Sequence, residues 1–304
     1  YIFDKLNYKD KQYLKDLNKI IRENDKLQLK ITKNSAAKKY WNTILPFSYR
    51  VKDVIKNNYR FPLRIAIFPG VSCMFYCGFC GRNQKAKYES SIIDEGISKI
   101  NNVISEANVG TKISISGGLE PLTNPKLGSI IKKGSEQGFK MPLITNAYSL
   151  TEGYLKKNPD IWLLDSLRVS LYGYDNESYK EITRLDKSFK IVKKNVINFL
   201  KYKNEINKKL KFDFNFIILP ENYDNLKEVL KLIKEINTEV NNGEGINFLT
   251  LRDDYQSVTG QDKNFDKDRK YRLNGSMSED ERKKLLEIIE NFENLRLKYC
   301  PDLH

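Results

Sequence analysis

The sequence is poor in the residues on which most hydrolytic active sites depend. Its single histidine, His304, is the last residue. The sequence contains no Walker phosphate loop, no His-Glu-x-x-His zinc motif and no Gly-x-Ser-x-Gly nucleophile motif. These absences exclude the common constellations for nucleotide hydrolysis, zinc-dependent proteolysis and serine-type acyl transfer.

Long apolar runs are also missing. No segment approaches the roughly 18 residues needed to span a bilayer, and the first ten residues, which include Asp4, Lys5 and Lys9, lack the apolar core of a secretory signal. The chain has only 4 cysteines, and three of them are clustered, which is unlike a disulfide framework and indicates a reducing compartment. We therefore expect a cytoplasmic protein that does not enter a membrane.

Acidic residues are outnumbered by basic ones, and the net charge is +14. The excess consists of lysines scattered along the chain among abundant asparagine and isoleucine, as an AT-rich coding sequence would produce. No compact block of five or six basic residues occurs. We therefore do not expect nucleic acid as a partner.

Three cysteines, Cys73, Cys77 and Cys80, lie within one short stretch after an apolar run. Thiolates select zinc or an iron–sulfur cluster. A closed zinc site needs a fourth ligand, and the other candidates, Cys300 and His304, lie more than two hundred residues further on. A cubane cluster held by three cysteines would instead leave one iron open to a non-protein ligand. The spacing alone leaves both metals possible.

Hydrophobic periodicity predicts an alternation of strands and helices from residue 61 onward. We predict strands at 63–68, 112–116, 139–144, 166–171, 212–219 and 246–251, with helices at 92–107, 125–137 and 151–157 and near 189–200 and 226–233. Ser91 and Asp94 form a potential capping box for the first of these helices. This pattern predicts an α/β fold with a parallel sheet closed or nearly closed into a barrel. We predict a helical N-terminal extension over 1–60, a partial barrel over 61–255, and a lid and helical cap over 256–304.

The spacing Cys73-x3-Cys77-x2-Cys80, with aromatic Phe79 before the last cysteine, resembles the radical S-adenosylmethionine (SAM) superfamily. The resemblance covers about residues 60–255 and implies a partial (β/α)6 TIM-like barrel. It also implies a [4Fe–4S] cluster on the three cysteines, SAM on the open iron, and Phe79 near the adenine. In this family an electron from the cluster cleaves SAM to methionine and a 5′-deoxyadenosyl radical, which takes a hydrogen atom from the substrate.

Four further stretches resemble SAM-binding motifs of that family. Gly117-Gly118-Leu119-Glu120-Pro121 is similar to its Gly-Gly-Glu-Pro motif, with Leu119 inserted, and Thr145-Asn146-Ala147 is similar to its Thr-Asn-Gly. Ser170 is predicted to point into the barrel, where the family places a polar residue for the ribose or carboxylate of SAM. Arg184 resembles the arginine that pairs with the carboxylate. The implied SAM-binding residues are thus Phe79, Gly117, Gly118, Glu120, Asn146, Ser170 and Arg184.

Substrate groups are predicted on the later strands, at Tyr172, Asn215 and Arg252. Short motifs around Arg82, Arg184 and Arg252 look like those of the DesII-like lyases and dehydrogenases, which act on nucleotide-linked amino sugars. That likeness implies an anionic small-molecule substrate, deamination or oxidation, and a reducing donor such as flavodoxin or ferredoxin. Two alternatives remain: an RNA- or peptide-modifying radical enzyme, and a non-catalytic iron–sulfur or zinc protein.

Overall fold

A computed structural model describes residues 61–80, 88–206, 208–219, 222, 225–240, 245–246, 248–253 and 296–300. The chain divides into two units, and all of these residues except Phe61 belong to the unit Pro62–Pro301. The helical extension predicted over 1–60 lies outside the described residues. So does most of the lid and helical cap predicted over 256–304.

The described unit is built on a parallel sheet of 7 strands, which lie side by side in their chain order. Each strand pairs in parallel with the next one along the chain, so β1 and β7 are the edges of the described sheet. The strands are β1 (Arg64–Ile67), β2 (Lys112–Ile115), β3 (Pro142–Thr145), β4 (Ser166–Leu171), β5 (Lys211–Ile218), β6 (Phe248–Asp253) and β7 (Arg296–Cys300). The predicted α/β class with a parallel sheet is confirmed.

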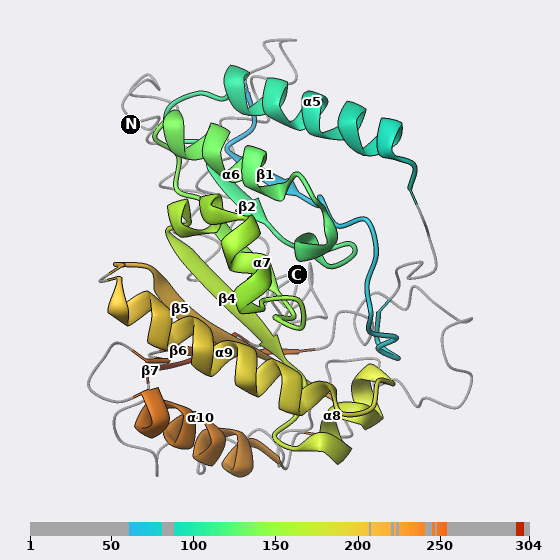
Figure 1. Ribbon diagram of the computed structural model, residues 1–304, viewed down its shortest axis with the longest axis vertical. Helices are drawn as coiled ribbons and strands as arrows, with labels where there is room; N and C mark the ends of the chain where they lie inside the picture. The colour runs from blue at the N-terminus through green and yellow to red at the C-terminus, as the bar shows by residue number, and fades with distance from the viewer. Residues whose placement is uncertain are drawn as a thin grey trace, which may run out of the picture. The chain divides into compact units, whose positions relative to one another are not determined.

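Helices connect the strands from β1 to β6, as parallel pairing requires (Figure 1). They are α5 (Ser90–Glu106), α6 (Leu127–Glu136), α7 (Glu152–Lys157), α8 (Asn176–Thr183), α9 (Ser188–Glu205) and α10 (Leu226–Val240), with short 3-10 turns η3 (Pro121–Thr123) and η4 (Pro159–Leu163). Within this described part of the chain, none of the helices combines the length and apolar character that a bilayer crossing requires.

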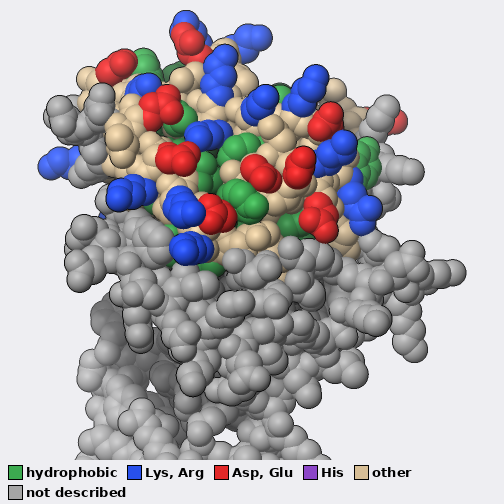
Figure 2. Space-filling view, turned by 90° about the horizontal axis from the view of Figure 1, so that it is seen from below, with side chains coloured by type: hydrophobic (Ala, Val, Ile, Leu, Met, Phe, Trp, Pro, Cys, Tyr) green, Lys and Arg blue, Asp and Glu red, His purple; other side chains and the backbone are tan. Residues whose placement is uncertain are grey.

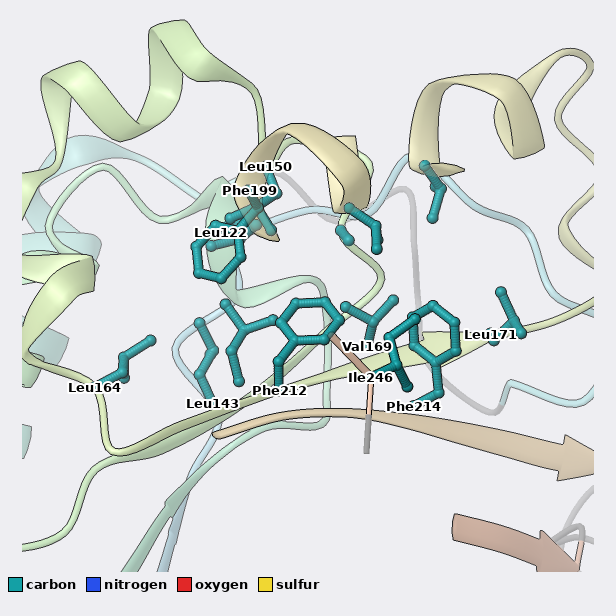
Figure 3. Close-up of a cluster of buried hydrophobic side chains, with 14 of the residues drawn as sticks. Leu122, Leu143, Leu150, Leu164, Val169, Leu171, Phe199, Phe212, Phe214 and Ile246 are labelled. Carbon is teal, nitrogen blue, oxygen red and sulfur yellow. The ribbon is translucent and has the colours of Figure 1, made fainter. Parts of the chain in front are cut away.

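The two faces of the sheet differ in chemistry. In β5 the buried Phe212, Phe214 and Phe216 alternate with Asp213 and Asn215, because successive side chains point to opposite faces. The phenylalanine face packs against the helices: the rings of Phe212 and Phe199 of α9 have centroids 5.6 Å apart. Figure 3 shows Phe212 and Phe214 within this cluster, together with Val169 and Leu171 of β4. The polar residues of β5 are therefore left for the inner face of the barrel.

Three local details differ from the sequence predictions. The proposed cap of α5 at Ser91 and Asp94 is wrong: the helix is preceded by Glu89, which makes no capping side-chain bond, and Asp94 forms an ion pair with Lys126. α8 was not predicted, because only a few of its residues, such as Tyr179 and Ile182, are apolar and buried. Its N-terminus is capped by the side chain of Asp175, which forms a capping box. β7 lies in the segment for which only a lid and a helix were predicted.

The surface charges on one end of the molecule are of mixed sign. Figure 2 shows lysine and arginine side chains interspersed with aspartate and glutamate on the end where α10 lies in Figure 1. Two ion pairs join α9 to α10. Lys193 Nζ lies 3.1 Å from Glu235 Oε2, and Lys201 Nζ lies 3.5 Å from Glu239 Oε1. This face therefore lacks the single-sign patch that is typical of a nucleic-acid interface.

Candidate active site

The three clustered cysteines lie on the loop that follows the carboxyl end of β1. Cys77 is buried, Cys73 and Cys80 are half-buried, and all three are free thiols. They line one cavity together with the residues that follow β2, β3 and β4. The carboxyl ends of parallel strands meet at one edge of a sheet, which is where barrel enzymes place their active sites.

This cavity brings together most of the residues singled out from the sequence. Its lining comprises Cys73, Phe75, Cys77, Phe79, Cys80, Gly117, Gly118, Leu119, Glu120, Pro121, Ile144, Thr145, Asn146, Ser170 and Tyr172. The residues expected to hold a cluster, those expected to contact SAM and one expected substrate residue thus surround a common space. The lining does not include Arg184 or Asn215, which the sequence also singled out.

The cysteine loop is fastened to the loop after β2 by backbone contacts. The N–H of Glu120 donates to Ser72 O at 2.9 Å, and the Thr123 hydroxyl accepts from the N–H groups of Val71 and Ser72 at 3.2 and 3.1 Å. Gly70 is required here, because a Cβ at this position would lie 2.4 Å from the backbone carbonyl of Leu119. The two loops are therefore positioned as one unit.

The turn after β2 depends on its two glycines. Gly117 and Gly118 have φ values of +57° and +63°, in the left-handed region that favours glycine. A Cβ on Gly117 would lie 2.5 Å from the ring of Phe68. The inserted Leu119 is 9% exposed, and Glu120 still reaches the cavity. The extra residue is thus accommodated without removing the carboxylate from the site.

Glu120 is buried and its carboxylate accepts three hydrogen bonds. Oε1 accepts from Thr145 Oγ1 at 2.5 Å and from Leu122 N at 3.1 Å, and Oε2 accepts from Asn146 N at 2.8 Å. Burial raises the pKa of Glu120 above its usual range, and these three donors oppose the shift. Thr145 is the last residue of β3 and Asn146 follows it, so Glu120 holds the ends of β2 and β3 together. Its carboxylate retains acceptor capacity toward the cavity.

Asn146 lies between the end of β3 and the cysteine loop. Its Nδ2 is 3.2 Å from Met74 Sδ and 3.8 Å from Cys73 Sγ, while its Oδ1 accepts from Tyr148 N at 3.0 Å. The next residue, Ala147, has φ +58° and is fully buried. It thus adopts the left-handed conformation that favours glycine, although it carries a Cβ.

Aromatic rings pack beneath the cysteine loop. Phe75 is 1% exposed and makes edge-on contacts with Tyr148, Tyr172 and Tyr179 at centroid distances of 5.7, 5.9 and 6.1 Å. Phe79 lies 5.8 Å from Tyr172. These rings exclude water from one side of the cavity, and they fix the position of Phe79 in its wall.

The remaining predicted residues have separate places. Ser170 is 8% exposed, belongs to β4 and lines the cavity. Arg184 ends α8 with φ +60°, and its positive charge acts on Cys77, although it does not line the cavity. Asn215 is buried on β5 outside the cavity lining. Arg252 belongs to β6, and its side chain lies outside the described residues.

The three thiols share a cavity in which they could hold a metal centre. Burial raises the pKa of Cys73 to about 11 and raises the pKa of Cys77 well above its usual value, and the neighbouring thiols add to both shifts. A positively charged metal centre would stabilise the thiolates. Among the residues that the structure describes, no three His, Cys, Asp or Glu side chains are close enough to chelate one ion. A cubane attaches each cysteine to a different iron, so it fits three thiols spaced around a cavity.

The sequence did not identify Thr145 and Thr123 as residues of the site. Thr145 lines the cavity, and its hydroxyl donates a hydrogen bond to the Glu120 carboxylate. The Thr123 hydroxyl accepts a hydrogen bond from the N–H of Val71, just before the cysteines. Thr145 could have been found as part of the Thr-Asn motif. Thr123 carries no local signal, because its partners lie 51 and 52 residues earlier in the chain.

A partial parallel barrel with a three-cysteine loop after its first strand, and a polar rim after the next strands, defines a class of iron–sulfur proteins. The profile described as the Radical SAM superfamily matches residues 67–233, and the chain belongs to this superfamily. Members of it use a [4Fe–4S] cluster and SAM.

One relative among curated proteins is the dTDP-4-amino-4,6-dideoxy-D-glucose ammonia-lyase of Streptomyces venezuelae, 33% identical over 270 residues. The match covers 87% of this chain and 53% of the relative, so the chain spans about half the length of that protein.

Solved structures of Streptococcus suis SuiB share the fold. SuiB bound to its precursor peptide SuiA has a TM-score of 0.58 at 18% identity, covering 85% of this chain and 54% of SuiB. SuiB bound to S-adenosylmethionine has a TM-score of 0.53 at 18% identity, covering 85% of this chain and 52% of SuiB.

Proposed function

We propose that this protein is a radical SAM enzyme that deaminates or oxidises a nucleotide-linked amino sugar. The cavity that joins the three cysteines to the motifs after β2 and β3 supports the radical SAM chemistry. The 33% identity to an ammonia-lyase that is named for a dTDP-linked amino sugar supports the substrate class.

The cluster, when bound, supplies the electron that cleaves SAM reductively and so generates the radical that takes a hydrogen atom from the substrate. The chain holds and orients the reactants. Cys73, Cys77 and Cys80 hold the irons, and the aromatic residues around Phe75 keep water from that wall.

The proposed contacts to SAM follow from the polar groups of the cavity. Glu120 has remaining acceptor capacity for the SAM amino group, and the glycine turn at 117–118 lets the backbone approach closely. Ser170 and Arg184 are proposed for the carboxylate or ribose, Asn146 for a polar contact beside Cys73, and Phe79 for the adenine.

The substrate side is proposed at Tyr172, Asn215 and Arg252. Arg252 belongs to β6 and pairs in register with Ile217 of β5 and Cys300 of β7. An arginine there would suit the diphosphate. We propose flavodoxin or ferredoxin as the electron donor and the cytoplasm as the location, because free thiols and a reducible cluster require a reducing compartment. We do not propose nucleic acid as a partner.

The test is anaerobic reconstitution with iron and sulfide, followed by incubation with SAM, dithionite and dTDP-4-amino-4,6-dideoxy-D-glucose. We expect a brown protein that forms 5′-deoxyadenosine, and ammonia or an oxidised sugar in step with it. A colourless zinc protein, or one that forms no 5′-deoxyadenosine with any nucleotide sugar, would contradict the proposal.

A further inference from the structure

Three buried polar residues form a row across neighbouring strands. Ser170 of β4 pairs in register with Asn215 of β5, which pairs with Thr250 of β6. Side chains in matched register of a parallel sheet share one face. Ser170 lines the cavity of the three cysteines, so Asn215 and Thr250 continue from that cavity along the inner face of the barrel.

Two members of this row have no partner for a buried polar atom. Asn215 is 3% exposed and Thr250 is 4% exposed. Within the described part of the chain, Asn215 Oδ1 and Thr250 Oγ1 are buried and make no hydrogen bond. An amide oxygen and a hydroxyl on adjacent strands could satisfy each other, and here they do not. Buried polar groups without a partner are costly, so each needs an explanation.

A third unpartnered atom lies one inward-facing position earlier on β4. The guanidinium of Arg168 bonds Asp213 Oδ2 through NH2 at 3.3 Å, but its Nε is buried and has no partner in the described structure. Arg168 and Asp213 pair in register directly before Ser170 and Asn215. Three unpartnered atoms therefore lie on adjacent strands: the donor Arg168 Nε on β4, the acceptor Asn215 Oδ1 on β5 and the hydroxyl Thr250 Oγ1 on β6.

The other buried asparagines of the described residues are satisfied. Asn195 Nδ2 donates to Ala147 O at 3.0 Å and to Tyr148 O at 2.8 Å. Asn124 and Asn222 each bond through both side-chain atoms, and so does Asn146. Single buried atoms without a partner also occur elsewhere among the described residues, at Asn101, Tyr154, Asn176, Tyr179 and Asn204. The row differs from these in having such atoms on three adjacent strands of the sheet.

We propose that Asn215 and Thr250, with Arg168 Nε, form the subsite for a hydroxyl or amino group on the sugar ring of the substrate. This inference rests on the proposed function and adds the ring-recognition residues to it. A carbon-bound hydroxyl both donates and accepts, so it satisfies Asn215 Oδ1 and Thr250 Oγ1 together. A phosphate oxygen only accepts, so it could bond Thr250 Oγ1 and Arg168 Nε but would leave Asn215 Oδ1 without a donor. The row therefore takes the sugar and not the diphosphate.

The first test separates a ligand-binding role from a structural one by stability. Asn215→Leu and Thr250→Val remove the unpartnered atoms at nearly constant volume, so the reconstituted variants should retain their iron and have an unchanged or higher Tm. The matched controls are Asn195→Leu and Thr183→Val. They remove satisfied groups, since Thr183 Oγ1 donates to Tyr179 O at 2.7 Å, and should lower Tm. A comparable loss of Tm in Asn215→Leu or Thr250→Val would overturn the assignment.

The second test measures sugar binding by the shift in Tm of the reconstituted protein with dTDP-4-amino-4,6-dideoxy-D-glucose. Wild type should be stabilised, and Asn215→Leu and Thr250→Val should each bind the sugar roughly tenfold more weakly. Added dTDP alone should stabilise wild type and both variants equally, because the row does not contact the diphosphate. If wild type and variants bind the sugar equally, the subsite is wrong while the proposed function stands. If wild type binds no nucleotide sugar, the proposed function fails and the subsite with it.

Discussion

Glu120 Oε2 accepts a hydrogen bond from the backbone N–H of Asn146 at 2.8 Å, which joins the loop after β2 to the loop after β3. Its other oxygen accepts from Thr145 Oγ1 and Leu122 N. The residue is thus a structural tie at the edge of the cavity as well as a candidate SAM ligand.

Replacing Glu120 with glutamine tests both roles, the contribution to stability and the binding of SAM. In Glu120→Gln one oxygen becomes an NH2 group, so in either amide orientation a donor would face a donor. We expect the free energy of unfolding to fall by roughly 1–3 kcal/mol and the Kd for SAM to rise. Urea unfolding and SAM titration measure the two effects. Unchanged unfolding would show that the three hydrogen bonds contribute nothing to stability.

The three cysteines should be necessary for cluster binding, and the fourth should not. We expect Cys77→Ala to lose both the cluster and SAM cleavage, because each cysteine of a three-cysteine cubane holds a different iron. Cys300→Ala is the control and should keep about four irons per chain. Iron analysis and absorption spectra of anaerobically reconstituted protein provide the measurement. Loss of iron in Cys300→Ala would show a fourth protein ligand.

Two glycines allow a matched test of how the cysteine loop is packed. Gly70→Ala places a methyl group 2.4 Å from backbone atoms of Leu119, and we expect it to cost roughly 1–3 kcal/mol and to reduce cluster loading. Gly96 lies within α5 and an added Cβ meets nothing within 4 Å. Gly96→Ala should therefore stabilise the protein by roughly 0.5–1 kcal/mol. Thermal unfolding compares both variants with wild type; equal Tm values for the two would contradict the close approach at Gly70.

Tyr172 tests whether the cavity wall depends on the ring or on the hydroxyl. Its ring contacts Phe75, Phe79 and Tyr179 at centroid distances of 5.9, 5.8 and 5.7 Å. Tyr172→Phe keeps these contacts, so its Tm and iron content should equal those of wild type. Tyr172→Ala should lose roughly 2 kcal/mol or more. A Tyr172→Phe variant with normal iron and a raised KM for the sugar would assign the hydroxyl to the substrate.

The sequence predicted the order of the strands from β1 to β6 and of most helices between them, and it identified most of the residues that line the cavity. Apolar alternation in β5 and the periodicity of α9 are local properties, and they predicted those elements. Cys73, Glu120 and Asn146 lie on the loops that follow β1, β2 and β3, so the parallel topology brings them to one edge of the sheet. The register that aligns Ser170, Asn215 and Thr250 could not be predicted, because it is set by packing between strands that are far apart in sequence. α8 and β7 were missed because the first has little apolar periodicity and the second lies after a long polar stretch.

The sheet keeps its strands in chain order from β1 to β7, and this has a consequence for synthesis. Each strand is synthesised after the strand at whose edge it pairs, and a domain generally folds as a unit. The cysteine loop follows β1, but the parts of its cavity contributed by β3 and β4 are made about 70 and 95 residues later. The thiols are therefore made long before the cavity that would shelter a cluster, and insertion of iron and sulfide belongs after the fourth strand has been translated.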